Sequence, residues 1–496
     1  MKNKQSTALL LALILSSFSV IGCSQEPSET TAETTQTEET VPAETEPEKL
    51  VPDLPERDFE GYEFSVLTRG QYNAEWYSED IYAEEITGEP INDAVFNRNM
   101  NVGSKYNFTI KELTGESENP DNSVIQAVAS GDAVYDMLMI GGVSSGNLAT
   151  QKYLYELSAI SYIDLTKPWY DQNANASLSI GSKLYMTSGD INIMDNNATY
   201  AILFSKVLAE QLTNENLYTL VSEGKWTLDK MEEYCSIAYT DLNGNGEYDP
   251  DDQWALIGEA WNTMAFVEGG GYKTFEKDEN DMPYIAVESE GFYDRFLLAM
   301  GLNADESHTM NNNRFRAQFS DVWNECIYRS FREARALFLC TSMNVVPMMR
   351  DMETDFGVIP MPKYNTEQEN YNCIVSIWAS NMLSIPITAS DSDLERTGII
   401  IEALSAESKY TLTPAYYDVT LKGKSTRDEE SEAMLDLIFS TRTFDLGIMF
   451  NWGNLYNNIC QMTDSNSTDL ASIIKSSYNT AVSEMQKTVD AILKEE

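Results

Sequence analysis

The sequence of 496 residues has few of the side chains that build redox-active or transition-metal sites. It contains one histidine, His308, so neither a histidine-rich metal centre nor an HExxH motif is possible. Its six cysteines form no CxxC pair, which argues against a zinc site of that kind. Without Cys23 an odd number remains, and we expect no disulfide framework among Cys235, Cys326, Cys340, Cys373 and Cys460.

Positive charge is also scarce. With 33 Lys and Arg against 79 Asp and Glu, the formal net charge at pH 7 is −46. Proteins that bind nucleic acid need a basic surface to contact phosphates, so nucleic acid is excluded as a partner. An acidic surface favours solubility, and it allows a cationic ligand without requiring one.

Long apolar runs are nearly absent, and the exception lies near residue 1. The basic start MKNKQ precedes ALLLALIL (8–15), which is too short to span a bilayer, and no later stretch is apolar enough to cross a membrane. The sequence VIGC, ending at Cys23, resembles a bacterial lipobox, which implies cleavage before Cys23 and a diacylglyceryl lipid on its thiol. The alternative is an ordinary secretory peptide with a chance cysteine. We expect a signal peptide over 1–22 and a lipid-anchored protein on the extracellular face of the cell membrane.

After Cys23 the composition changes to Thr, Glu, Pro and Ser, with almost nothing to bury. Such a segment cannot offset its ordering entropy, so we predict a disordered tether over residues 23–56. The rest of the chain is long enough for two domains or lobes.

Strand and helix patterns alternate in the first part of the body. Apolar alternation and helical spacing predict, in order, a strand at 62–70, a helix from Pro90, a strand at 108–113, a helix at 122–132 and a strand at 135–142. This order is typical of an α/β lobe with a largely parallel sheet. Ligands bind such sheets at the carboxyl ends of strands, which here carry TRG (68–70) and GGVSSG (141–146).

The stretch DLNGNGEYDPDD (241–252) has the spacing of an EF-type calcium loop, with Gly246 at its sharp turn. Its predicted ligands are Asp241, Asn243, Asn245, the Glu247 carbonyl, Asp249 and Asp252. The last ligand is Asp instead of Glu, and WALIG (254–258) after the loop reads as a strand, so the second helix of a calcium sensor is missing. We therefore expect a structural Ca²⁺ site within one lobe and no organic cofactor. A Gly/Asn turn with chance acids is the alternative.

Three further patterns concern helices. Thr227 is a good N-cap, which gives the neighbouring Trp226 a structural role. Ser392 and Glu395 predict a capping box at the start of DLERTGIIIEALSAES (393–408). An apolar stripe predicts that one face of a long C-terminal helix belongs to the core, through Leu470, Ile474, Tyr478, Ala481, Met485 and Ile492.

The order of five segments resembles a known family. They are ASGDAVYDMLMIGG (129–142), YLYELSAISYIDLTKPWYDQNANASLSIGSKLYMTSGD (153–190), GKWTLDKMEEYCSIAYTDLNGNGEYDPDDQWAL (224–256), DFGVIPMPKYNTEQENY (355–371) and TPAYYDVTLKGKSTRDEESEAMLDLI (413–438). Following a lipobox, this order resembles the carbohydrate-type extracellular solute-binding lipoproteins of ABC importers, which are related to maltodextrin-binding protein. The resemblance extends over residues 57–496.

The resemblance implies a two-lobed α/β fold of the type II periplasmic-binding-protein class. Lobe 1 would comprise 57–194 plus 373–420, and lobe 2 would comprise 195–372 plus 421–496. Hinge strands near 190–205 and 360–375 would join the lobes. It also implies a monomer without catalytic activity that captures a small solute, a sugar or oligosaccharide, and delivers it to ABC permease subunits.

Sugar sites combine flat aromatic rings with a few oriented polar groups. The resemblance places Trp169, Trp261, Trp378 and Trp452 in segments that line the cleft of carbohydrate-binding relatives, although core packing is the alternative for each. Polar candidates at loop and hinge positions are Arg69, Ser144, Ser145 and Asn196. Where relatives often carry a further aromatic residue, this chain has Met343 and Asn344, which argues against maltodextrin-like specificity.

Other functions fit parts of the sequence. GVSSG (142–146) matches the G-x-S-x-G pattern of a hydrolase acting on esters, with Ser144 as nucleophile and His308 as base. The many acidic residues also permit the carboxylate pair of a glycosidase, though no spacing singles one out. A binding module that passes its closed state to a signalling receptor is a third reading. We predict a non-catalytic binding protein.

Overall fold

The computed structural model describes residues 49–70, 76–115, 120–388, 390–421 and 429–494. The chain divides into two compact units after Lys49, and the second unit, Leu50–Glu496, contains all the helices and strands that the structure describes. The predicted signal peptide, the predicted lipidation site Cys23 and most of the predicted tether lie outside the described residues. Among the helices that the structure describes, none combines the length and the apolar character needed to cross a bilayer.

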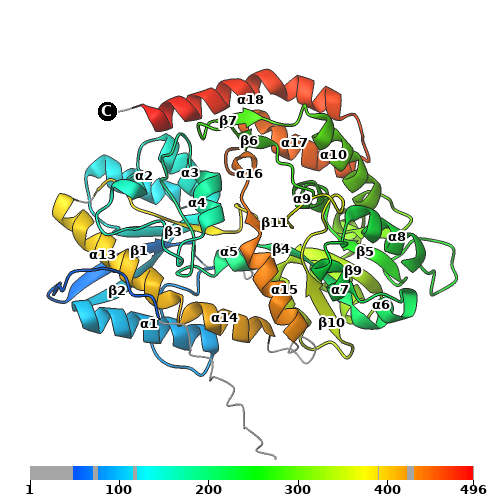
Figure 1. The fold of residues 1–496 in the computed structure, drawn as a ribbon, viewed down its shortest axis with the longest axis horizontal. Coiled ribbons are helices and arrows are strands. Elements are labelled where there is room, and N and C mark those ends of the chain that lie inside the picture. The colour runs from blue at the N-terminus through cyan, green and yellow to red at the C-terminus, as the bar shows by residue number, and fades with distance from the viewer. Residues whose placement is uncertain (1–48, 71–75, 116–119, 389, 422–428, 495–496) are drawn as a thin grey trace, which may run out of the picture. The chain divides into compact units, whose positions relative to one another are not determined.

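The first sheet is mostly parallel. Its order is β12-β3-β1-β2, in which β1 runs parallel to both neighbours and β12 runs antiparallel to β3. The strands are β1 (Tyr62–Thr68), β2 (Phe108–Thr114), β3 (Met137–Gly141) and β12 (Asn381–Ser384). The accompanying helices are α1 (Pro90–Tyr106), α2 (Asp121–Ser130), α3 (Gly142–Thr150), α4 (Gln172–Leu178), α5 (Met194–Asn197), α13 (Asp391–Ser408) and α14 (Leu412–Leu421). The strands and helices predicted between residues 62 and 142 are confirmed (Figure 1).

Local sequence explains how α1 connects β1 to β2. Pro90 occupies the first turn, where its missing N–H costs nothing. Val95 and Val102 on the inner face are buried, and the helix ends at Asn107, whose φ of 54° is left-handed and whose N–H donates to the Gly103 carbonyl. The chain then enters β2 at once, at Phe108, and pairs with β1 in register.

The second sheet is mixed. Its order is β10-β4-β9-β5-β8, with β4 antiparallel to β9 and β10, and β5 parallel to β8 and β9. The strands are β4 (Tyr200–Ser205), β5 (Trp254–Gly258), β8 (Thr309–Asn311), β9 (Ala336–Ser342) and β10 (Phe356–Ile359). The accompanying helices are α6 (Lys206–Leu212), α7 (Leu217–Ser222), α8 (Leu228–Ala238), α9 (Asn262–Gly269), α10 (Glu290–Asn303), α11 (Asn312–Phe315) and α12 (Tyr328–Arg332). The strand predicted at WALIG is confirmed as β5.

Segments that are far apart in the sequence connect the regions around the two sheets. β11 (Cys373–Ile374) pairs in parallel with β13 (Arg442–Thr443), and Thr199 bridges Val375. The first sheet draws its strands from 57–194 and 373–420, and the second from 195–372. The predicted lobe boundaries are compatible with this division, and they stay a prediction.

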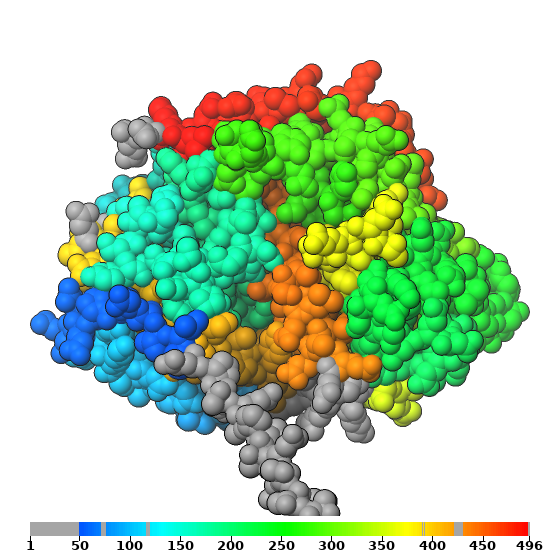
Figure 2. All heavy atoms as spheres, in the orientation of Figure 1, coloured from blue at the N-terminus to red at the C-terminus, as the bar shows by residue number. Residues whose placement is uncertain are grey.

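The C-terminal third adds helices that contact both groups. They are α15 (Glu429–Ser440), α16 (Leu446–Phe450), α17 (Leu455–Asp464) and α18 (Leu470–Leu493), and a short hairpin of β6 (Phe275–Lys277) and β7 (Pro283–Ile285) lies nearby. α18 packs against α17 and also reaches α3, and its red residues extend over both groups in Figure 2. The predicted core stripe is confirmed, because Leu470, Ile474, Ala481 and Ile492 are buried, with Tyr478 and Met485 partly buried.

The start of α13 differs from the prediction. Ser390 is the N-cap, and it forms the capping box with Asp393, so the helix begins two residues before the predicted Ser392 cap. Both pairs have the same spacing of three residues. The box that starts at Ser390 satisfies as many backbone N–H groups at the helix start as a box at Ser392 would. It also lengthens the helix by about half a turn.

Candidate functional site

A cavity of about 800 Å³ lies between residues of the two sheets' groups. This volume falls within the range of roughly 300–1,000 Å³ typical of small-molecule sites. Its lining comprises Trp76, Val143, Asn147, Tyr200, Glu259, Trp261, Trp323, Tyr328, Thr341, Ser342, Asn344, Ser376, Trp378, Ala379, Ile448, Met449, Phe450, Asn451, Tyr456 and Asn457.

Strand ends explain why these residues meet. β3 ends at Gly141 just before Val143, β5 ends at Gly258 just before Glu259, and β9 ends at Ser342. The carboxyl ends of strands are the usual ligand edge of an α/β sheet. The predicted role of GGVSSG agrees in position, because Val143 lines the cavity.

Aromatic rings dominate the lining. The rings of Trp323 and Tyr328 stack with centroids 5.5 Å apart and 29° between their planes. Tyr200 and Trp261 lie closer, at 4.5 Å, and are tilted by 52°. Trp378 is 43% exposed, which is unusual for so large an apolar side chain, and it lines the cavity.

Amide and hydroxyl groups complement the rings. Asn147, Asn344, Asn451 and Asn457 supply both donors and acceptors, and the Ser342 hydroxyl donates to Asn344 Oδ1 at 2.6 Å. Such groups match the hydroxyls of a neutral polar ligand. The lining is therefore amphipathic, with flat apolar faces beside oriented amides.

One acidic side chain lines the cavity among the described residues, that of Glu259. The Tyr200 hydroxyl donates to Glu259 Oε1 at 2.7 Å. Burial raises the pKa of the Glu259 carboxyl above its ordinary value, while the bond from Tyr200 and the charge of Arg316 act in the opposite direction. Burial likewise raises the pKa of the Tyr200 hydroxyl, so this group stays a donor at neutral pH.

The structure brings three of the predicted ligand-binding residues, Trp261, Asn344 and Trp378, into the cavity lining. It places Trp169 and Trp452 in the core, 1% and 2% exposed. Trp169 packs with Tyr170, and the indole N–H of Trp452 donates to the Thr488 hydroxyl at 2.9 Å.

The other predicted ligand-binding residues lie outside the lining. Ser144, Ser145 and Met343 are buried. Asn196 accepts a hydrogen bond from the Arg442 guanidinium at 2.6 Å. Arg69 is 2% exposed and donates to the carbonyls of Trp378 and Ala379 at 3.0 and 3.1 Å, with its guanidinium 5.0 Å from the centre of the Trp378 ring. It therefore supports the segment that presents Trp378.

Sequence reasoning missed most of the aromatic lining. Trp323 and Tyr328 belong to DVWNECIYRS (321–330), whose spacing reads as an ordinary amphipathic helix. Tyr200 sits in a fully buried strand, where a core role is the default. The signal available was the aromatic content next to strand ends, since Glu259 and Trp261 both follow the predicted strand WALIG.

The predicted calcium loop is held by hydrogen bonds in the structure. Asp241 accepts from the N–H groups of Gly244 and Gly246, at 2.6 and 2.9 Å. The buried Asp252 carboxylate accepts from the Tyr239 hydroxyl at 2.9 Å and from the Leu242 N–H at 3.2 Å. One loop thus carries all the predicted oxygen ligands for calcium, namely Asp241, Asn243, Asn245, Glu247, Asp249 and Asp252. Calcium binding stays a prediction.

The two parts of the hydrolase alternative belong to different sheets. Ser144 is buried in α3, beside the first sheet. His308 precedes β8 in the second sheet, and its Nε2 lies 3.2 Å from the Leu302 carbonyl oxygen. The structure therefore places nucleophile and base on separate elements.

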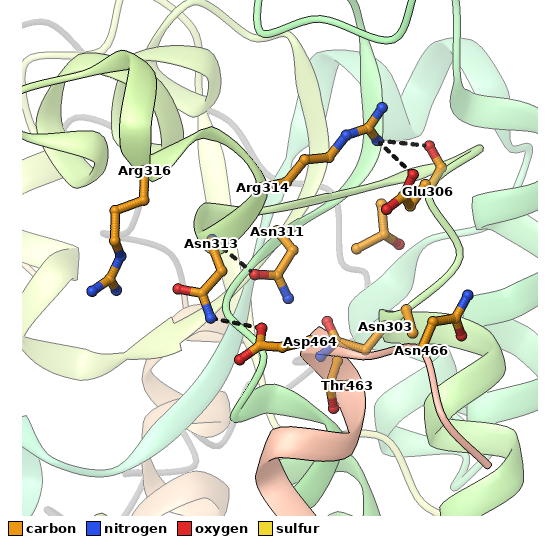
Figure 3. A pocket seen from close by; sticks show the side chains of 11 residues that line it. Asn303, Glu306, Asn311, Asn313, Arg314, Arg316, Thr463, Asp464 and Asn466 are labelled. Carbon is orange, nitrogen blue, oxygen red and sulfur yellow. Dashed lines mark hydrogen bonds and ion pairs between the residues drawn. The ribbon is translucent and has the colours of Figure 1, made fainter.

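A second cavity, of about 410 Å³, lies among the end of α10, β8, α11 and the end of α17 (Figure 3). Asparagine and arginine side chains surround it, and the amide of Asn313 donates to Asp464 at 2.7 Å. Arg316 points away from the other labelled residues in Figure 3. No aromatic ring lines this cavity among the described residues, so it lacks the stacking surfaces of the first.

Comparisons with known proteins give structural matches alone. No protein-family model matches the sequence, and no curated protein matches it. A cyclo/maltodextrin-binding protein solved with maltotetraose matches with a TM-score of 0.55 and 12% identity, over 87% of this chain and 98% of that chain. An ABC substrate-binding protein from Listeria monocytogenes in complex with cycloalternan matches with a TM-score of 0.54 and 10% identity, over 85% and 99%.

RafE from Streptococcus pneumoniae, in its apo form, matches with a TM-score of 0.53 and 13% identity, over 86% of this chain and 98% of that chain. These matches extend over nearly the full length of each solved protein, and at such low identity they define the fold. The expected fold class is confirmed: the chain has the α/β fold with two mixed sheets that ABC substrate-binding proteins of the type II periplasmic-binding class share.

Proposed function

We propose that this protein is the substrate-binding component of an ABC importer and that it captures a carbohydrate. The observation that carries the proposal is the 800 Å³ cavity, whose aromatic and amide lining comes from both sheets of a substrate-binding-protein fold. Two solved proteins with this fold are complexes with maltotetraose and cycloalternan, and these ligands support the carbohydrate class.

The lining supports a simple binding mechanism. The C–H faces of a sugar ring stack on Trp261 and Trp378, while Asn147 and Asn344 pair with its hydroxyls. Val143 and Asn147 follow the first sheet, and Glu259 and Trp261 follow the second. A ligand that touches both groups stabilises the closed arrangement, because only that arrangement makes all the contacts at once.

Partners and location follow from the sequence resemblance. The closed form would be recognised by two permease subunits, and a lipid on Cys23 would hold the protein at the extracellular face of the membrane. The acidic surface is compatible with an exposed, monomeric protein. A receptor that reads the same closed form is the competing partner, and neighbouring genes for permease subunits distinguish the two.

Ligand titration tests the proposal. We expect oligosaccharides from a panel of neutral and amino sugars to raise the melting temperature and to compact the protein in small-angle scattering, without being converted. Trp261→Ala and Trp378→Ala each remove a stacking face and should weaken binding about tenfold or more, because each factor of ten corresponds to about 1.4 kcal/mol.

Tyr284→Ala is the matched control, since Tyr284 is 47% exposed on β7 and lines neither cavity. It should bind like the natural protein. Hydrolysis of a panel member, or the absence of binding and compaction with every member, would overturn the proposed function.

A further inference from the structure

The described part of the cavity lining contains an acidic side chain and no basic one. Among the described lining residues, Glu259 is the only acidic side chain, and no Lys or Arg accompanies it. Arg69 and Arg316 lie outside the lining. Arg69 is buried under Trp378, and Arg316 is exposed to water, although its charge still lowers the pKa of the Glu259 carboxyl. The chain around this carboxylate has a net charge of −46. An anionic ligand is therefore disfavoured, and a cationic one is attracted.

The fold holds Glu259 in a fixed position. Its backbone N–H donates to Asn262 Oδ1 at 2.6 Å, and its carbonyl accepts from the Asn303 amide at 3.0 Å. Tyr200 fixes carboxylate oxygen Oε1 at 2.7 Å. The second oxygen, Oε2, has no hydrogen-bond partner among the described residues, and the side chain is half-buried at the cavity. One acceptor is thus positioned and left available.

Closing the cavity over Glu259 Oε2 costs free energy unless the charge of the carboxylate is balanced. A ligand that fills the cavity removes the remaining water from the carboxylate, and a buried unpaired charge is strongly unfavourable. A sugar hydroxyl donates a hydrogen bond but leaves the negative charge in place, whereas an ammonium group cancels it. Trp261 lines the same cavity two residues after Glu259, and its ring adds a favourable cation–π contact for an ammonium but not for a hydroxyl.

We propose that the cavity selects amino sugars, and that Glu259 is the specificity-determining residue that binds their protonated amine. This inference rests on the proposed function, because it specifies the class of carbohydrate. The aromatic faces and asparagines bind the sugar ring as they would in any neutral saccharide. The carboxylate then distinguishes an ammonium group from the hydroxyl or acetamide of otherwise identical ligands.

Three tetrasaccharides provide a matched test, because they share a β-1,4 backbone and differ only at carbon 2 of each unit. They are the tetramer of glucosamine with an amine, cellotetraose with a hydroxyl, and the tetramer of N-acetylglucosamine with an acetamide. The monosaccharides glucosamine, galactosamine, glucose and galactose extend the test to ligands without a linkage. We expect the amine to bind at least tenfold tighter than its neutral counterparts by calorimetry at low salt, and this preference to decrease as salt is added.

Glu259→Gln keeps the shape and the acceptor for Tyr200 but removes the charge. It should weaken binding of the amine about 30-fold or more, and it should not weaken binding of the neutral probes, because these no longer bury an unbalanced charge. Glu306→Gln removes the same charge from the exposed rim of the second cavity and should leave the preference intact.

Each outcome decides a separate question. Neutral probes that bind as tightly as their amino counterparts, or a Glu259→Gln variant that keeps the preference, would overturn the inference and leave the proposed function standing. Failure of every probe, amino and neutral alike, to bind or to compact the protein would overturn both.

Discussion

At the scale of single residues, the structure contains a buried carboxylate that the sequence did not reveal. Glu268 on α9 is 2% exposed, and neither of its oxygens has a hydrogen-bond partner among the described residues. Burial raises the pKa of the Glu268 carboxyl well above its ordinary value, and the nearby Asp445 raises it further. The folded protein therefore holds a proton at Glu268 at pH values where the unfolded chain has lost it.

This difference predicts how stability depends on pH. As the pH rises above the ordinary glutamate pKa and toward the raised folded pKa of Glu268, each unit costs about 1.4 kcal/mol of folding free energy. Glu268→Gln removes this cost, so its melting temperature relative to the natural protein should increase between pH 5 and pH 8. Glu306→Gln, an exposed control, should show a constant difference. An unchanged difference for Glu268→Gln over this range would show that Glu268 is not held protonated.

Tryptophan shows what residue types can and cannot predict. The sequence placed Trp261 and Trp378 near a ligand, and the structure puts both in the cavity lining, but Trp169 and Trp452 received the same assignment and lie in the core. A tryptophan packs well in either place, and only tertiary contacts decide between them. In the case of Trp452, these contacts are a Phe450 ring stacked at 4.9 Å and the Thr488 hydroxyl.

At the scale of elements, local signals predicted where helices and strands occur better than where they begin. Pro90 and the left-handed Asn107 delimit α1 clearly. At α13, two Ser-x-x-acid pairs overlap, and the sequence alone does not rank them. The structure uses the first pair, Ser390 and Asp393.

Two alanine variants distinguish these caps. Ser390→Ala removes the acceptor for the first turn of α13, and loss of such a cap costs about 1 kcal/mol. We expect faster amide hydrogen exchange in the first turn of α13. Ser392→Ala, two residues further on, should exchange like the natural protein. The reverse pattern would support the cap originally predicted at Ser392.

The loop from Asp241 to Asp252 gives a second prediction at this scale. Extracellular calcium loops bind with dissociation constants of about 10⁻⁴–10⁻³ M. If calcium fixes the loop between α8 and β5, about 5 mM calcium should raise the melting temperature relative to excess chelator, while the shift caused by a sugar ligand is retained.

Asp241→Asn should abolish this calcium effect. Asp278→Asn, which changes an acid in the turn between β6 and β7, is the control and should retain it. Identical melting curves in calcium and in chelator would refute the metal site.

At the scale of the whole molecule, the alternation of strands and helices predicted the α/β class, and the family resemblance predicted the two-part fold. Long-range pairings were beyond the sequence. Arg442 of β13 donates to Asn196, and its guanidinium lies 2.7 Å from Asp171 and 3.2 Å from Asp195. Both carboxylates are far from Arg442 in the sequence. No local pattern marks such partners, because two carboxylates among 79 acidic residues carry no distinguishing spacing.

The cavity depends on the same long-range geometry. Its lining draws on segments from Trp76 to Asn457, and each contributes one to a few side chains. The sequence predicted the strand ends that bring Val143 and Glu259 there. It did not predict Trp323 or Tyr456, which approach from helices whose orientation is set by packing.

The attachments of α18 are unequal at its two ends. The first half of α18 packs against α17, where Leu470 and Ile474 are buried and the Asn458 amide donates to the Ser477 hydroxyl at 3.0 Å. Its last turn meets the first sheet's surroundings through bonds from Tyr185 and Lys152 to the carbonyls of Ile492 and Lys494. If the sheets separate to admit a solute, those terminal bonds and the packing of the buried Ile492 are the contacts to be released. The helix would then move together with the second sheet, once the contacts of its last turn with the first sheet's surroundings have broken.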